Sequence, residues 1–177
     1  MVTQTKKPLL TSSAPPQVRG HGRAGRRILI IEARFYEDIA DELVQGAVQE
    51  LEAQGAVYDR VAVPGALEIP QVLAQAVAAG LIPSSAPSAR FAGAIALGCV
   101  IRGETAHYDI VCNNANHWLM DVAIRHGVPV GNGILTVENE KQALARAKGG
   151  RDGKGGDAAR ACLRLVETAH VFEGQCV

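Results

Sequence analysis

The segment that most constrains the fold is residues 91–101, which are apolar almost without interruption. Such a run is typical of a parallel β-strand covered on both faces. The chain then turns at Arg102-Gly103, and from about Thr105 the apolar residues follow the spacing of a buried helix face. That face comprises Val111, Ala115, Trp118, Leu119 and Val122. The segment therefore predicts a buried strand that leads directly into a helix.

The same alternation runs through the rest of the chain. Strands are predicted at 27–31, 57–63, 91–101 and 128–136, each followed by a helix, and one more helix lies near the C-terminus. A chain that alternates in this way forms a parallel sheet with helices on both faces and right-handed crossovers. In such sheets, ligands bind at the carboxyl ends of the strands.

The residues that follow the first three strands are therefore the candidates for function. Phe35 either packs against the start of a helix or offers a flat surface to a planar ring. Glu68 either interacts with a helix dipole or accepts hydrogen bonds from a polyol. Residues 103–105 either begin an ordinary capped helix or form an anion site of free backbone N–H groups. His107, in the first turn, can transfer protons near neutral pH. Because all of these converge on one edge of the sheet, a functional site is favoured.

Charge and cysteine content narrow the class of protein. Residues 1–27 hold six basic residues and no acidic one, which leaves twelve basic against eighteen acidic residues and a net charge near −6 in the remainder. That balance argues against nucleic acid binding by the folded part. No apolar run approaches the length of a membrane span. The four scattered cysteines suggest small core residues in a reducing, cytoplasmic protein.

Two segments are expected to lack regular structure. Residues 1–26 are rich in Pro, Ser, Gly and basic residues, and we predict a disordered basic tail that is dispensable for folding and chemistry. The catalytic domain would then span 27–177. Residues 149–156 are glycine-rich and are interpreted as a flexible basic hinge. They resemble a Walker loop only in composition, because they follow no strand.

With these features in place, the chain resembles the lumazine synthase family of riboflavin biosynthesis. The match rests on residues 63–70, 97–108, 133–136, 142–147 and 154–159, which read VPGALEIP, LGCVIRGETAHY, GILT, QALARA and KGGDAA. It covers roughly residues 27–170. The resemblance implies an α/β fold, a three-layer α/β/α sandwich with a four-stranded parallel, flavodoxin-like sheet.

The resemblance also implies a transferase reaction. 5-Amino-6-ribitylaminouracil would condense with 3,4-dihydroxy-2-butanone 4-phosphate to give 6,7-dimethyl-8-ribityllumazine, inorganic phosphate and water, with neither metal nor organic cofactor. Family members form pentamers, and in some cases decamers or sixty-subunit shells, with sites shared between neighbouring subunits. Two alternatives remain open: a non-catalytic flavin or lumazine carrier, and a cage-forming subunit without activity.

Residue by residue, the resemblance implies one catalytic residue and a set of binding residues. His107 would transfer protons, and Phe35 would stack on the pyrimidine. The ribityl chain would contact Ala66, Leu67 and Glu68. The pyrimidine edge would meet main-chain groups of Cys99, Val100 and Ile101. The phosphate would be bound by Glu104, Thr105, Arg146 and Lys154.

This sequence departs from the family's pattern at three places. Tyr36 stands where many members have Asn, and Asn132 stands where many have an aromatic residue. Residues 113–118 are unlike the corresponding family segment, although Trp118 fits the predicted buried stripe. Arg146 and the end of the fourth strand would come from the neighbouring subunit, and Asn132 would make that subunit's lid over the ring polar.

Overall fold

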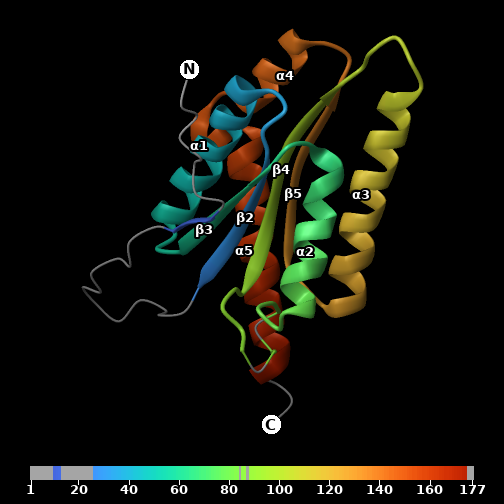
Figure 1. Cartoon of the computed structure of the whole chain (residues 1–177). Helices are drawn as coiled ribbons and strands as arrows, with labels where there is room; N and C mark the ends of the chain where they lie inside the picture. The colour runs from blue at the N-terminus through green and yellow to red at the C-terminus, as the bar shows by residue number, and fades with distance from the viewer. Residues whose placement is uncertain (1–9, 13–25, 84, 87, 175–177) are drawn as a thin grey trace, which may run out of the picture.

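A central sheet lies between two layers of helices (Figure 1). The computed structural model describes residues 10–12, 26–83, 85–86 and 88–174. The strands are β1 (Leu10–Ser12), β2 (Arg27–Ala33), β3 (Val57–Val63), β4 (Gly93–Ile101) and β5 (Val130–Val137). The α-helices are α1 (Glu37–Ala53), α2 (Ile69–Ala78), α3 (His107–His126), α4 (Glu140–Ala147) and α5 (Lys154–Gly174). Two short 3-10 turns are η1 (Ala66–Glu68) and η2 (Gly150–Asp152).

The strand order of the sheet is β1-β3-β2-β4-β5. The four strands β2 to β5 are parallel to one another, as the alternation of strand and helix predicts. The structure adds one strand to that prediction: Leu10–Ser12 pairs antiparallel with β3, with Leu10 opposite Val61. This pairing covers what would otherwise be an open edge of β3. The rest of the predicted tail before Arg26 lies outside the described residues.

Each face of the sheet has its own apolar core. On one face, α1, α4 and α5 cover a cluster that includes Ile30, Leu43 and Ile95, all fully buried. On the other, α2 and α3 cover a cluster that includes Ile31 and Leu119. Burying one such side chain contributes about 1.5–3 kcal/mol. The two-sided burial explains why β2 and β4 are apolar along most of their length.

The glycines of β5 allow a helix to approach the strand closely. A Cβ atom built on Gly131 would collide with the carbonyl oxygen of Ala158 in α5, and one on Gly133 would come within 3.1 Å of the Ala158 Cβ. A glycine inside a strand indicates that another backbone or a ligand comes close, and here the partner is the backbone of α5.

The predicted flexible hinge at residues 149–156 is wrong. The segment forms η2 and the first turn of α5, and it packs against the backbone of α1. A Cβ on Gly155 would collide with the carbonyl oxygen of Leu43, and one on Gly46 would collide with that of Gly150. The glycines therefore serve close packing between backbones, which composition alone does not distinguish from flexibility.

Helix α3 differs from its prediction at two points. It begins at His107, two residues after the expected start, and ends at His126 before the left-handed Gly127 (φ 63°) as predicted. Trp118 was expected in the buried stripe but is 50% exposed. It lies beside the buried face formed by Ala115 and Leu119, and its ring meets that of His117 edge-on with the centroids 4.9 Å apart.

Candidate active site

A cavity of about 410 Å³ opens where β2, β3 and β4 end. Nine of the thirteen predicted site residues line it: Phe35, Ala66, Leu67, Glu68, Cys99, Val100, Ile101, Thr105 and His107. Residues from three strand ends are thus brought together, as the topology of a parallel sheet requires. The wall also contains Gly103, a candidate for the anion site, and residues that the sequence analysis did not assign to the site, namely Pro64, Gly65, Tyr108 and Val111, together with Tyr36.

Phe35 lies at the mouth of the cavity. Its side chain is 72% exposed, so it does not pack as an ordinary core residue. Its ring meets that of Tyr36 edge-on, with the ring centroids 4.9 Å apart and the planes at 73°. This contact leaves a face of Phe35 available to a planar ligand, because an edge-to-face pair covers at most one face of either ring.

Glu68 is held in place by the backbone that precedes it. The Gly65 N–H donates to Glu68 Oε2 at 2.9 Å, within the turn η1. A Cβ on Gly65 would lie 3.2 Å from the same oxygen, so the absence of a side chain there leaves room for the carboxylate. Glu68 therefore presents an oriented acceptor to the cavity, as hydroxyl groups of a polyol require.

The last residues of β4 form the floor of the cavity. Burial, together with the charge of the nearby Cys112, raises the pKa of the Cys99 thiol to about 11. Cys99 is therefore protonated at neutral pH and is not a nucleophile, since the thiolate is the reactive form. Burial raises the pKa of Tyr36 as well, with a smaller contribution from Cys99. This part of the wall is uncharged and suits a heterocycle.

The loop between β4 and α3 forms the polar end of the cavity. In the described part of the chain, the backbone N–H groups of Gly103, Glu104, Thr105 and Ala106 donate no hydrogen bond. A Cβ on Gly103 would meet open space, so a ligand can approach the backbone there. His107 follows in the first turn, with its own N–H 3.4 Å from Thr105 Oγ1. Unpaired N–H groups at the start of a helix are suited to binding an anion.

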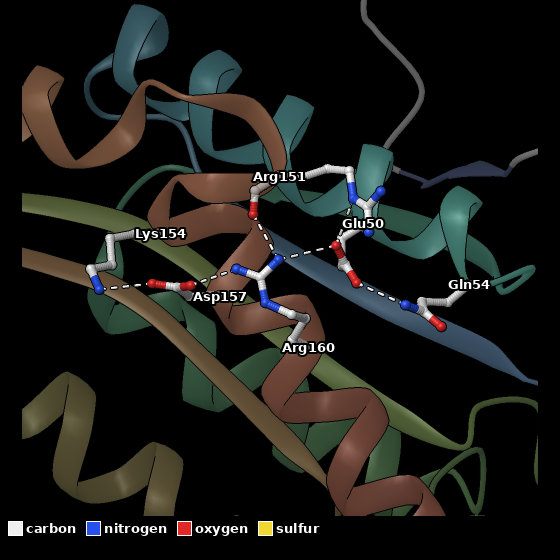
Figure 2. Close-up of polar contacts among 6 residues, drawn as sticks. All are labelled: Glu50, Gln54, Arg151, Lys154, Asp157 and Arg160. Carbon is white, nitrogen blue, oxygen red and sulfur yellow. Dashed lines mark hydrogen bonds and ion pairs between the residues drawn. The ribbon is translucent and has the colours of Figure 1, made fainter.

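The four remaining predicted residues do not line the cavity. Glu104 lies in the exposed loop before α3. Arg146, on α4, is exposed and donates to the Gln142 carbonyl at 3.2 Å. Lys154, at the start of α5, pairs with Asp157 at 2.7 Å (Figure 2). Both cations belong to the α1, α4 and α5 layer, and among the described residues no lysine or arginine lines the cavity.

Asn132 also lies apart from the cavity. It stands opposite Ala96 in the middle of β5, several residues before the carboxyl end of that strand. Its Nδ2 donates to Asn116 Oδ1 of α3 at 2.7 Å, and its Oδ1 accepts the N–H of Ile134 at 3.0 Å. Residues 113–118, which are unlike the corresponding family segment, thus contribute Asn116 as a partner for Asn132.

Two features are absent from the described residues. No three His, Cys, Asp or Glu side chains within them are grouped so as to hold a metal ion. None of the helices found there is both long and apolar enough to cross a bilayer.

Comparison with known proteins gives a consistent result. A family model described as 6,7-dimethyl-8-ribityllumazine synthase matches residues 25–170. The protein named 6,7-dimethyl-8-ribityllumazine synthase 1 from Rhodopseudomonas palustris is 52% identical over 143 residues, which are 81% of this chain and 85% of the relative. The synthase from Agrobacterium fabrum is 51% identical over 79% of this chain and 92% of its own length. Synthase 1 from Rhizobium meliloti is 53% identical over 79% of this chain and 89% of its own length.

Proposed function

The chain belongs to the 6,7-dimethyl-8-ribityllumazine synthase family, and from this premise we propose that its cavity is one half of an active site completed by a second copy. The reaction is the family's step in riboflavin biosynthesis. It condenses 5-amino-6-ribitylaminouracil with 3,4-dihydroxy-2-butanone 4-phosphate and yields 6,7-dimethyl-8-ribityllumazine, phosphate and water. The proposal concerns which residues carry that reaction and which chain supplies them.

The pyrimidine and its ribityl chain occupy the part of the cavity between Phe35 and Glu68. Phe35 stacks on the ring, and the main chain from Cys99 to Ile101 meets the ring's polar edge. The Glu68 carboxylate accepts hydrogen bonds from ribityl hydroxyls. This assignment is supported by the exposed Phe35 ring and by the fixed position of the Glu68 carboxylate.

The butanone phosphate occupies the opposite end, with its phosphate on the N–H groups of residues 103–106. The 5-amino group of the pyrimidine attacks the ketone, and loss of water gives an imine. Phosphate then leaves, and closure of the ring releases a second water. Each step moves a proton, and His107, beside the phosphate, is placed to accept and return it. Holding both substrates in contact supplies a further share of the rate.

The observation that carries the two-chain proposal is that no lysine or arginine from the described part of the chain lines the cavity. A phosphate dianion is bound more strongly when a charged side chain joins the backbone N–H groups. Arginine is often that side chain, because its guanidinium can donate two parallel hydrogen bonds to a phosphate. Arg146 and Lys154 are the family's candidates, yet both lie in the helix layer away from the cavity of their own chain. We propose that they serve the cavity of a neighbouring subunit in a homopentamer, or in a multiple of pentamers. With its free thiols at Cys99, Cys112 and Cys162, such an enzyme suits the cytoplasm.

Subunit mixing tests this arrangement. His107→Ala and Arg146→Ala proteins are each expected to be impaired when assayed alone at low butanone phosphate. If the site is shared, co-assembled mixtures contain sites with an intact His107 from one chain and an intact Arg146 from its neighbour. Activity should then exceed the average of the two pure variants.

The control for this experiment mixes the two variants without unfolding or exchange of subunits, so that each remains in its own assembly. Activity equal to the average after genuine co-assembly would contradict a shared site. A wild-type protein that binds lumazine but forms none from the two substrates would instead favour the carrier or cage alternatives.

A further inference from the structure

We propose that Arg102 is a positioning residue that fixes the first turn of α3, and with it His107 and the N–H groups that receive the phosphate. The inference rests on the proposed function of this cavity and adds a residue to which no role has been assigned. Arg102 directly follows β4 and precedes the loop at residues 103–106. It does not line the cavity, so it acts through its neighbours rather than on the substrate.

The guanidinium of Arg102 contacts both residues that follow His107. Its centre lies 4.0 Å from the centroid of the Tyr108 ring. Its two terminal nitrogens lie 3.4 and 3.5 Å from the two carboxylate oxygens of Asp109. One side chain thus holds the first turn of α3 in two ways: its guanidinium lies over the Tyr108 ring, and both terminal nitrogens pair with the Asp109 carboxylate.

A second anchor joins the same side chain to the end of β5. The Arg102 Nε lies 3.1–3.2 Å from the carboxylate of Glu138, and the Arg102 backbone N–H donates to the Val137 carbonyl at 2.9 Å. Arg102 therefore connects three segments: the end of β4, the start of α3 and the end of β5. The loop it spans makes no backbone hydrogen bond through the N–H groups of residues 103–106, so few other contacts define its shape.

The geometry of arginine, rather than its charge alone, carries this role. Arg102 is 40% exposed and its two carboxylate partners are more so, and isolated ion pairs of this kind contribute little to stability. Lysine keeps the charge but lacks the planar fork and the stacking face. We therefore expect Arg102→Lys to reproduce most of the defect of Arg102→Ala, with little change in the melting temperature of either variant.

The measurement is steady-state kinetics with each substrate varied in turn. Both variants should show a several-fold to tenfold higher KM for the butanone phosphate and a lower kcat. The KM for the pyrimidine should remain near the wild-type value, because Phe35 and Glu68 follow β2 and β3 and do not belong to the loop that Arg102 holds. Arg125→Ala is the matched control: Arg125 pairs with Asp121 at 2.7 Å on the same helix, near its other end.

Hydrogen exchange gives a readout that does not depend on turnover. Peptides covering residues 103–112 should exchange faster in both Arg102 variants, while peptides from α2 and β2 remain unchanged. If the wild-type protein does not form lumazine, the proposed function fails. The hydrogen-exchange measurement still tests whether Arg102 positions the first turn of α3. Equal changes in both KM values, unchanged kinetics, or unchanged exchange in 103–112 would each overturn the positioning role.

A double-variant cycle with Asp109→Asn tests whether the contact acts as a unit. If Arg102 acts through Asp109, the effects of Arg102→Lys and Asp109→Asn on kcat/KM for the butanone phosphate should be less than multiplicative in the double variant. Fully multiplicative effects would mean that the two residues act independently, which contradicts the proposal.

Discussion

The carboxylate of Glu50 in α1 accepts a hydrogen bond from Arg160 in α5 at 3.1 Å, although 110 positions separate the two residues. Figure 2 shows that the same carboxylate also accepts from Arg151 at 2.8 Å and from Gln54 at 3.1 Å. The Glu50 side chain is fully buried, whereas both arginines remain partly exposed. Glu50 thus joins α1 to the segment that leads into α5.

Replacing Glu50 with alanine should destabilise the fold. The variant removes three hydrogen bonds. The two that come from the charged arginines are each worth roughly 1.5–3 kcal/mol. Because both arginines can still reach water, we expect a loss of about 2–3 kcal/mol in the free energy of unfolding. Urea denaturation measures it, with Glu37→Gln, an exposed position on the same helix, as the control. A loss no larger than that of the control would contradict this assignment.

Acid should weaken the same contact. Burial alone would raise the pKa of Glu50, but hydrogen bonds from Arg151 and Gln54 and the charges of both arginines outweigh it and hold that pKa below its ordinary value of 4.5. A hydrogen bond from Lys154 similarly lowers the pKa of Asp157 from 3.8. A depressed pKa contributes stability that is present above the unfolded value and is lost as the pH falls through the folded one.

The free energy of unfolding should therefore decrease below about pH 4.5. The Glu50→Gln protein should have a lower free energy of unfolding at pH 7 than the wild type. That free energy should fall less on acidification, because the variant carries no carboxylate at that position. Parallel denaturation curves at pH 7 and at acid pH measure the difference. Identical acid sensitivity in both proteins would show that Glu50 does not titrate as described.

His107→Ala should slow the enzyme without abolishing its activity. General acid–base catalysis typically contributes about 10²–10⁴-fold. The amine is already a competent nucleophile and phosphate a competent leaving group, so we expect a loss at or below the low end of that range. Single-turnover formation of lumazine absorbance measures it. A variant with the wild-type rate and an unchanged pH profile would remove His107 from the mechanism.

Arg146→Ala should weaken binding of the phosphorylated substrate. A charge-assisted arginine–phosphate contact is worth roughly 1.5–3 kcal/mol, which corresponds to about a ten- to hundredfold higher KM. Inorganic phosphate should become a weaker competitive inhibitor by a similar factor. Arg164→Ala, an exposed position on α5 whose pair with Glu167 is long at 3.6 Å, is the control. An unchanged KM would mean that Arg146 does not bind the phosphate.

Much of the fold is predictable from local patterns because the central strands β2 and β4 are buried on both faces. The 57–63 strand is predicted at its observed bounds, and the stop of α3 at Gly127 follows from its left-handed backbone. Trp118 was misplaced because helical spacing identifies a face but not its margins. The glycines at 149–156 were misread because close packing and flexibility favour the same residue. The short strand at Leu10–Ser12 carries too few residues for a detectable pattern.

The candidate site is predictable where it depends on topology. Phe35, Glu68 and His107 follow three different strands, and the parallel sheet brings them to one cavity. Arg102 was not singled out because an arginine after a strand gives no signal by itself. Its role depends on Tyr108, Asp109 and Glu138, which only the folded chain brings into contact.

The side chain of Asn132 has a consequence for how copies of this protein behave when crowded together. β5 is the last strand of the sheet, and an open strand edge is a template on which another chain can add. By accepting the Ile134 N–H, Asn132 occupies a donor that an incoming strand would need. An aromatic residue at this position offers no such acceptor. The asparagine thus leaves the edge of β5 with one donor fewer for an added strand.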